Sequence, residues 1–119
     1  MKRAIYDLQK RLISFSAMII SKRFLDMENF ASQHLNKQLI RSATAAALNY
    51  GEAQSAESRR DFIHKMRLSL KELRESQINL SIVKEANLVY DPASFLQVFT
   101  ECNELVAIFS ASIKTTQNA

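Results

Sequence analysis

Seven basic side chains, counting one histidine, lie in the stretch between residues 59 and 74. Five of them recur at spacings of four, three, four and three residues: Arg60, His64, Arg67, Lys71 and Arg74. On an α-helix this spacing keeps all five, here called the basic stripe, on one face opposite the apolar seam. Arg59 and Lys65 flank the stripe. Such a face suits phosphate groups, which supply most of the affinity in sequence-independent nucleic-acid binding, so the pattern favours an RNA- or DNA-binding surface.

The same face has a second interpretation, as an ordinary solvated helix surface. Acidic residues lie among the basic ones and neutralise part of their charge: Glu57, Asp61, Glu72 and Glu75. No aromatic side chain lies on the stripe, so a base-stacking platform is not indicated. The formal net charge of +4 favours an anionic partner only mildly. The sequence leaves both interpretations open.

A second polar group lies on or near the facing sides of the segments 30–53 and 56–86: Arg41, Asn49, Glu52, Glu72 and Glu75. If these segments pair antiparallel about Ser55, Glu52 lies level with Arg59 and Asn49 with Phe62. Arg41 then comes within reach of Glu72 or Glu75. We predict that the group forms hydrogen bonds between helices or between subunits, which fix the packing register. A ligand-binding or catalytic site is the alternative.

Enzymatic chemistry finds little support in the remaining residues. A carboxylate-bridged metal centre in a four-helix bundle needs a Glu-x-x-His pair on two helices and a glutamate on each of the others. The nearest match is Asp61-x-x-His64. Cys102 falls in an apolar seam, where it behaves as a small hydrophobe, and the single glycine, Gly51, cannot form a phosphate-cradling loop. We predict no catalytic residue, no metal site, no cofactor and no enzymatic activity.

The scarcity of turn-forming residues indicates which elements carry these side chains. The 119 residues include one glycine and one proline, too few for the turns of a β-rich fold. Apolar or small residues recur at spacings of three and four over about 3–24, 30–53, 56–86 and 92–115, as amphipathic helices require. The chain is therefore predicted to be all-α, an antiparallel up-down-up-down four-helix bundle forming one domain over residues 1–119.

Residues that favour helix ends lie at these limits. They are Asp26 or Asn29, Ser55 or Ser58, Asn87, and Asp91 followed by Pro92. Asn87 fits the end of the third helix, and the others fit helix starts.

Apolar residues exceed what one seam per helix can bury. Those off or beside the seams are Ile13, Met18, Ile20, Ile40, Ile63, Leu70, Ile78, Ile82 and Ile108. A monomer would expose some of them, and a broad apolar surface usually marks an interface. We therefore predict a homo-oligomer.

Cysteine usage and apolar run lengths bear on the compartment. The one cysteine cannot form an internal disulfide and fits a reducing compartment. The apolar stretch 12–20 follows basic residues but lacks the cleavage site of a signal peptide. No apolar run approaches the ~20 residues that span a bilayer. We expect a cytoplasmic protein without membrane association.

Several motifs follow one another in a recognisable order: Gln38-Leu39-Ile40-Arg41-Ser42-Ala43-Thr44, then Asn49, then Glu52-Ala53, then Ser58-Arg59-Arg60-Asp61-Phe62-Ile63-His64-Lys65. Mainly over residues 38–90, the chain resembles the bacterial four-helix-bundle family first noticed as products of intervening sequences in large-subunit ribosomal RNA genes. A sister branch contains the accessory variability proteins of diversity-generating retroelements. Glu72 and Glu75 fall where the family tends to place glutamates. The chain departs at Ala46-Ala47-Leu48, where members often have proline or glycine, and this leaves the branch open.

The resemblance implies a barrel-like homopentamer with no known enzymatic activity. The retroelement branch implies nucleic-acid binding and partnership with a reverse transcriptase. We therefore expect a pentameric scaffold that binds RNA or DNA through Arg59, Arg60, His64, Lys65, Arg67, Lys71 and Arg74. The alternative is a protein–protein adaptor whose basic face docks an acidic partner such as a reverse transcriptase.

Overall fold

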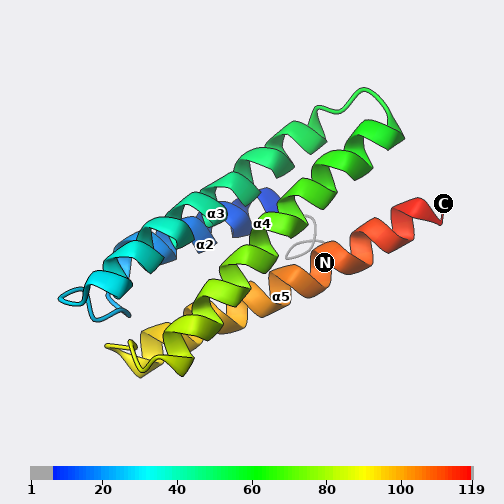
Figure 1. Cartoon of the computed structure of the whole chain (residues 1–119). Helices are drawn as coiled ribbons and strands as arrows, with labels where there is room; N and C mark the ends of the chain where they lie inside the picture. Colours follow the sequence, from blue (N-terminus) through cyan, green and yellow to red (C-terminus); the bar gives the residue numbers. More distant parts are fainter. Residues whose placement is uncertain (1–6, 119) are drawn as a thin grey trace.

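Four long helices form the described part of the chain. The computed structural model describes residues 7–118, with helices α2 (Leu8–Ser21), α3 (Phe30–Gln54), α4 (Arg59–Glu85) and α5 (Pro92–Gln117). Successive helices run in opposite directions, and α2 and α4 each pack against α3 and α5 (Figure 1). Within residues 7–118 the only β-type pairing is one isolated bridge. The predicted all-α antiparallel four-helix bundle is confirmed.

Three of the predicted capping residues hold the helix starts. Asn29 Oδ1 accepts a hydrogen bond from the Ala31 amide at 2.7 Å at the start of α3. Ser58 Oγ accepts one from the Asp61 amide at 3.0 Å at the start of α4. Asp91 caps α5, with proline in the first turn. These bonds satisfy backbone N–H groups that have no partner within the helix.

Some predicted helix limits are wrong by a few residues. The helix predicted to begin at 56 begins at Arg59, because Ser58 and not Ser55 is the cap. The helix predicted to end at 24 ends at Ser21, and the backbone turns extended at Lys22. Residues 3–6 of the predicted first helix lie outside the described residues. At the end of α4, Asn87 adopts a positive φ of 58° just beyond the helix.

The early end of α2 frees its following residues to pair with the loop after α4. Leu25 and Val89 form the isolated antiparallel bridge. The Asp26 amide donates to Leu88 O at 3.0 Å, and the Tyr90 amide donates to Phe24 O at 2.7 Å. These bonds join the two loops at one end of the bundle.

The buried side chains follow the predicted seams. Fully buried examples from the four helices are Leu12, Phe15, Leu39, Ala43, Ala46, Leu73, Leu80, Cys102 and Phe109. Between α3 and α4 several contacts are made by small residues, and these two helices share the most extensive contact in the bundle. Buried serines bond across this contact: Ser42 Oγ lies 2.6 Å from Ser76 Oγ, and Ser69 Oγ donates to Ala46 O at 2.9 Å.

An arginine on α2 connects this helix to α5, with which α2 shares a smaller contact than with α3. Arg11 donates to both carboxylate oxygens of Glu101, at 3.0 and 2.6 Å, and to Glu104 at 2.9 Å. The Glu101 carboxylate raises the pKa of Arg11 above its ordinary value. A two-pronged contact of this kind adds geometric specificity, so it helps to set how α2 lies on α5.

Candidate nucleic-acid interface

The basic stripe lies on the solvent side of α4. Its five residues are all exposed, whereas Met66, Leu73 and Leu80 of the same helix are buried. At ~1.5 Å per residue, the stripe extends about 21 Å along the helix axis from Arg60 to Arg74. The predicted position of the stripe, opposite the core, is confirmed.

A hollow adjoins the N-terminal half of the stripe. Its volume is about 830 Å³, it is open to solvent, and it is lined by Ser58, Arg59, Arg60, Asp61, Ile63, His64, Arg67 and Gln117. It therefore lies between the start of α4 and the end of α5. Three stripe residues and Arg59 bring basic groups to this hollow, and Asp61 contributes a carboxylate.

Most of the stripe is not neutralised by neighbouring acids. Arg60, His64 and Arg67 form no ion pair with any residue between 7 and 118. Lys71 Nζ lies 3.9 Å from Glu75 Oε2, and exposed pairs of this kind contribute little. Arg74 donates to Ser110 Oγ on α5 at 3.3 Å. An approaching anion therefore meets basic groups along the whole stripe.

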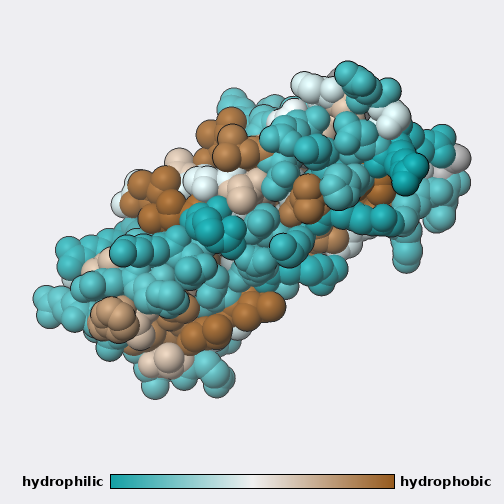
Figure 2. Space-filling model, turned by 45° about the horizontal axis from the view of Figure 1, so that its top comes forward, coloured by the Kyte–Doolittle hydropathy of each residue, from teal (hydrophilic) through white to brown (hydrophobic). Residues whose placement is uncertain are grey.

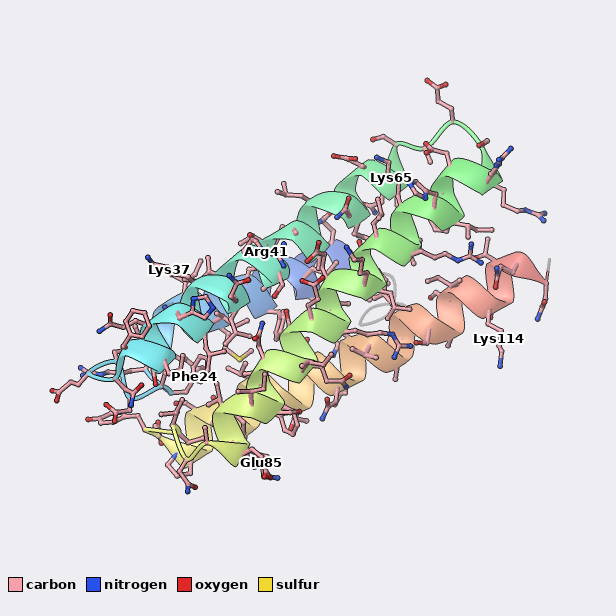
Figure 3. All side chains as sticks on the ribbon, viewed as in Figure 1. Phe24, Lys37, Arg41, Lys65, Glu85 and Lys114 are labelled. Carbon is pink, nitrogen blue, oxygen red and sulfur yellow. The ribbon has the colours of Figure 1, made fainter. Side chains whose placement is uncertain are left out.

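Two glutamates that could neutralise the stripe are turned toward α3. Arg41 Nη2 lies 3.2 Å from Glu72 Oε1 and also pairs with Glu75, as predicted. The Glu72 carboxylate, with Glu75 as a smaller cause, raises the pKa of Arg41. Figure 3 labels Arg41 on α3, where this helix faces α4. Glu72 and Glu75 thus pair with Arg41 of α3, and most of the stripe keeps its positive charge.

The register between α3 and α4 differs from the prediction. Glu52 pairs with Lys65 at 2.5 Å, six residues beyond the predicted Arg59. The reason is the connection 55–58, which places the turn nearer to Ser58 than to Ser55. Lys65 consequently lies at the α3 edge of α4, beside the stripe (Figure 3).

A protein-family model matches nearly the whole length of the bundle. The sequence model described as 23S rRNA-intervening sequence protein matches residues 6–111. The chain belongs to the 23S rRNA-intervening sequence protein family. The match extends beyond residues 38–90, which carry the motifs of the sequence analysis, into α2 and α5. No curated protein matches the chain.

The fold of this family member is shared with a solved structure from Bacteroides thetaiotaomicron, a protein of unknown function from the S23 ribosomal protein family. The TM-score is 0.75 and the sequence identity 23%. The alignment covers 92% of this chain and 97% of that chain. The likeness therefore concerns the complete four-helix arrangement.

Several residues of the motifs quoted in the sequence analysis lie at the contact between α3 and α4 or at the start of α4. Arg41 pairs with glutamates of α4, Ser42 bonds to Ser76, and Ser58 caps α4. Asn49 behaves differently, because its Nδ2 donates to Ala45 O at 3.0 Å within its own helix. The hydrogen bond that the structure describes for Asn49 therefore lies within α3, whereas a bond between helices was predicted. A bond from Asn49 to another subunit stays a prediction.

Two contacts of the structure have no counterpart in the sequence predictions. Arg11 and Glu101 are 90 residues apart in the chain, and Arg23 lies over the ring of Tyr90. The sequence signal that could have indicated the Arg11–Glu101 contact is that each of these residues adjoins a buried seam residue. No sequence signal joins Arg23 to Tyr90, since both lie in loops.

Large apolar side chains are exposed on all four described helices. Of the nine surplus apolar residues, Ile13, Ile20, Ile78 and Ile82 are exposed, and the other five pack partly against the core. Ile78 and Ile82 line a hollow of about 630 Å³ on α4, on the helical face that carries the stripe. Leu96 lines another, of about 460 Å³, between α2 and α5. Figure 2 shows hydrophobic patches of this kind on a mainly hydrophilic surface.

Residues 7–118 contain neither a cluster of metal-ligating side chains nor a helix that could span a membrane. No group of three or more histidine, cysteine, aspartate or glutamate side chains is placed to hold a metal ion. None of the described helices combines the length and apolar character needed to cross a bilayer. Asp61 and His64, the nearest match to a metal-ligand pair, both line the hollow beside the stripe.

Proposed function

We propose that this protein is a non-enzymatic, cytoplasmic homopentamer that binds RNA or DNA through the basic face of α4. That face consists of Arg59, Arg60, His64, Lys65, Arg67, Lys71 and Arg74. The observation that carries the proposal is the exposure of the whole stripe while Glu72 and Glu75 of the same helix are turned toward Arg41. The family name specifies no ligand, so the stripe supports the proposal by itself.

The chemistry of the face favours phosphate contacts over base reading. Arginine and lysine groups follow a straight line of about 21 Å, and phosphate contacts of this kind position a nucleic acid without reading its sequence. The hollow beside Arg60, His64 and Arg67 adds room for a backbone to lie between α4 and α5. The expected binding is therefore sequence-independent and sensitive to salt.

Oligomerisation is supported by two exposed apolar areas. One lies on α4 around Ile78 and Ile82, and the other consists of Ile13 and Ile20, both exposed on α2. Helices α2 and α4 are diagonal in the bundle, so the areas face different directions. Two unlike patches are what a ring of identical subunits needs, because each subunit then binds its neighbour head to tail. A ring would also repeat the basic face and increase avidity.

Light scattering of the purified protein checks the subunit number. We expect the mass of a pentamer of 13.6 kDa chains. The substitution Ile78→Glu or Ile13→Glu should lower the measured mass, because it places a charge in the interface. A monomeric wild-type protein at high concentration would overturn the oligomer.

The basic face is checked by fluorescence anisotropy of labelled RNA and DNA at two salt concentrations. In a variant with Arg60→Gln, Arg67→Gln and Lys71→Gln, we expect binding to weaken about tenfold or more, because three phosphate contacts are lost. The dependence of log affinity on log salt should also become shallower, by about 0.7–0.9 for each lost contact.

The matched control removes the same charge elsewhere. Lys10, Lys37 and Lys114 are exposed on α2, α3 and α5, and changing all three to glutamine lowers the net charge equally. We expect this control to bind nearly as well as the wild type. Equal weakening of both variants would show that net charge, not the stripe, drives binding. A wild-type protein that binds no nucleic acid at low salt would overturn the proposal and favour an acidic protein partner.

A further inference from the structure

An aromatic and a basic side chain meet on the surface where two loops are joined. The Arg23 guanidinium carbon lies 5.0 Å from the centre of the Tyr90 ring. Arg23 belongs to the α2–α3 connection and Tyr90 to the α4–α5 connection. The tyrosine is 59% exposed. The pair therefore presents a flat cationic and aromatic surface to solvent.

The backbone holds this surface in place. The Tyr90 amide bonds to Phe24 O, directly after Arg23, and the Asp26 amide bonds to Leu88 O. Phe24, Leu25 and Leu88, which belong to the same two loops, are buried. Both members of the pair are thus fixed on anchored backbone, and little ordering would be needed when a ligand stacks on them.

Charged side chains of both signs lie near the pair. Lys22 is exposed and precedes Arg23 in the chain. Two carboxylates also lie in these loops, where Asp91 accepts hydrogen bonds from the Ala93 amide and Ser94 Oγ and Asp26 accepts one from the Glu28 amide. An anionic ligand with a flat ring would therefore find basic groups next to the stacking surface.

We infer that Tyr90 and Arg23 form a stacking platform for an unpaired nucleobase, with Lys22 and Arg23 near the adjoining phosphate. Stacking on aromatic rings and on arginine planes is how proteins hold single strands without reading sequence. Paired bases are stacked within their duplex and cannot use such a platform. The inference rests on the proposed nucleic-acid binding and extends it to a preference for single strands.

The test compares a single-stranded oligouridylate with an RNA duplex of equal length, by anisotropy. In a Tyr90→Leu variant, we expect binding of the single strand to weaken about fivefold or more, the usual effect of losing one stacked base. Duplex binding should be unchanged, and Tyr90→Phe should bind both like the wild type, since the ring is kept. Circular dichroism confirms that the variants are folded.

A second measurement does not depend on affinity. The chain contains no tryptophan, so a Tyr90→Trp variant carries one indole, at the platform. We expect its fluorescence to be quenched by the single strand and not by the duplex. Absence of quenching by a bound single strand would overturn the platform.

The outcomes separate the two proposals. If Tyr90→Leu leaves both ligands unaffected while the stripe variant loses binding, the platform is wrong and the basic face stands. If Tyr90→Leu weakens single-strand binding and the stripe variant does not, the basic face is wrong and the platform stands. A wild-type protein that binds neither ligand overturns both.

Discussion

In the native protein, the Cys102 thiol should react with a disulfide reagent such as dithionitrobenzoate about a thousandfold more slowly than in the unfolded chain. Cys102 is completely buried. Burial, with a smaller effect of the Glu101 charge, raises its pKa from 9.0 to about 12. Since the thiolate is the reactive form, this rise lowers the reactive fraction near neutral pH by about three orders of magnitude.

The measurement is unambiguous because the chain has one cysteine. Release of the coloured thiolate is followed in buffer and again in denaturing urea. Cys102 Sγ also donates to Leu73 O on α4 at 3.5 Å, and the thiol must lose this contact before it reacts. A native rate close to that of the unfolded chain would contradict the burial of this thiol.

The same burial gives a direction to the pH dependence of stability. The pKa of the thiol is higher in the folded than in the unfolded chain, so the folded state holds the proton more tightly. The resulting stability is fully present below pH 9.0 and is lost as the pH rises toward about 12. The free energy of unfolding of the wild type should therefore fall more steeply above pH 9.0 than that of a Cys102→Ala variant, which has no thiol to titrate.

Leu73→Ala is expected to destabilise the bundle by about 2–5 kcal/mol. Leu73 is completely buried on α4, between the serines that bond to α3 and next to Cys102 of α5. Removing most of its side chain leaves a cavity that the helices close only partly. Since a domain of this size has a total stability of about 5–15 kcal/mol, the change removes a large share, and urea unfolding should show it as a lower midpoint with an unchanged slope.

Leu48→Ala supplies the control with the same chemistry. Leu48 lies on α3 and is 69% exposed, so its truncation should change the stability by no more than about 0.5 kcal/mol. If both substitutions had equal effects, the seam of α4 would not be the core of this protein.

Local patterns were enough to predict the helices. Asn29, Ser58 and Asp91 cap α3, α4 and α5, and the buried residues of each helix recur at the predicted spacing. Contacts between distant segments could not be predicted from local patterns. The end of α2 depends on backbone bonds from Phe24 and Asp26 to residues some sixty positions later, and neither residue type signals a partner.

The candidate interface was predictable to a similar degree. Helical geometry alone placed Arg60 to Arg74 on the exposed side of α4. The register with α3 was not predictable, because it depends on where the connecting turn lies, and a shift of a few residues gave Glu52 to Lys65 instead of Arg59. The Arg23–Tyr90 pair required two loops to be brought together, which only the folded bundle does.

The bridge between these loops makes the two ends of the bundle unequal. At the other end, the single connection 55–58 bonds mainly within its own turn, the Ser55 amide to Glu52 O and the Ala56 amide to Ala53 O. Amide hydrogens there exchange with solvent by local fraying. The Asp26 and Tyr90 amides bond across the bundle, so their exchange requires the α2–α3 and α4–α5 hairpins to part at this end. Two loop amides thus report on the separation of the halves of the protein.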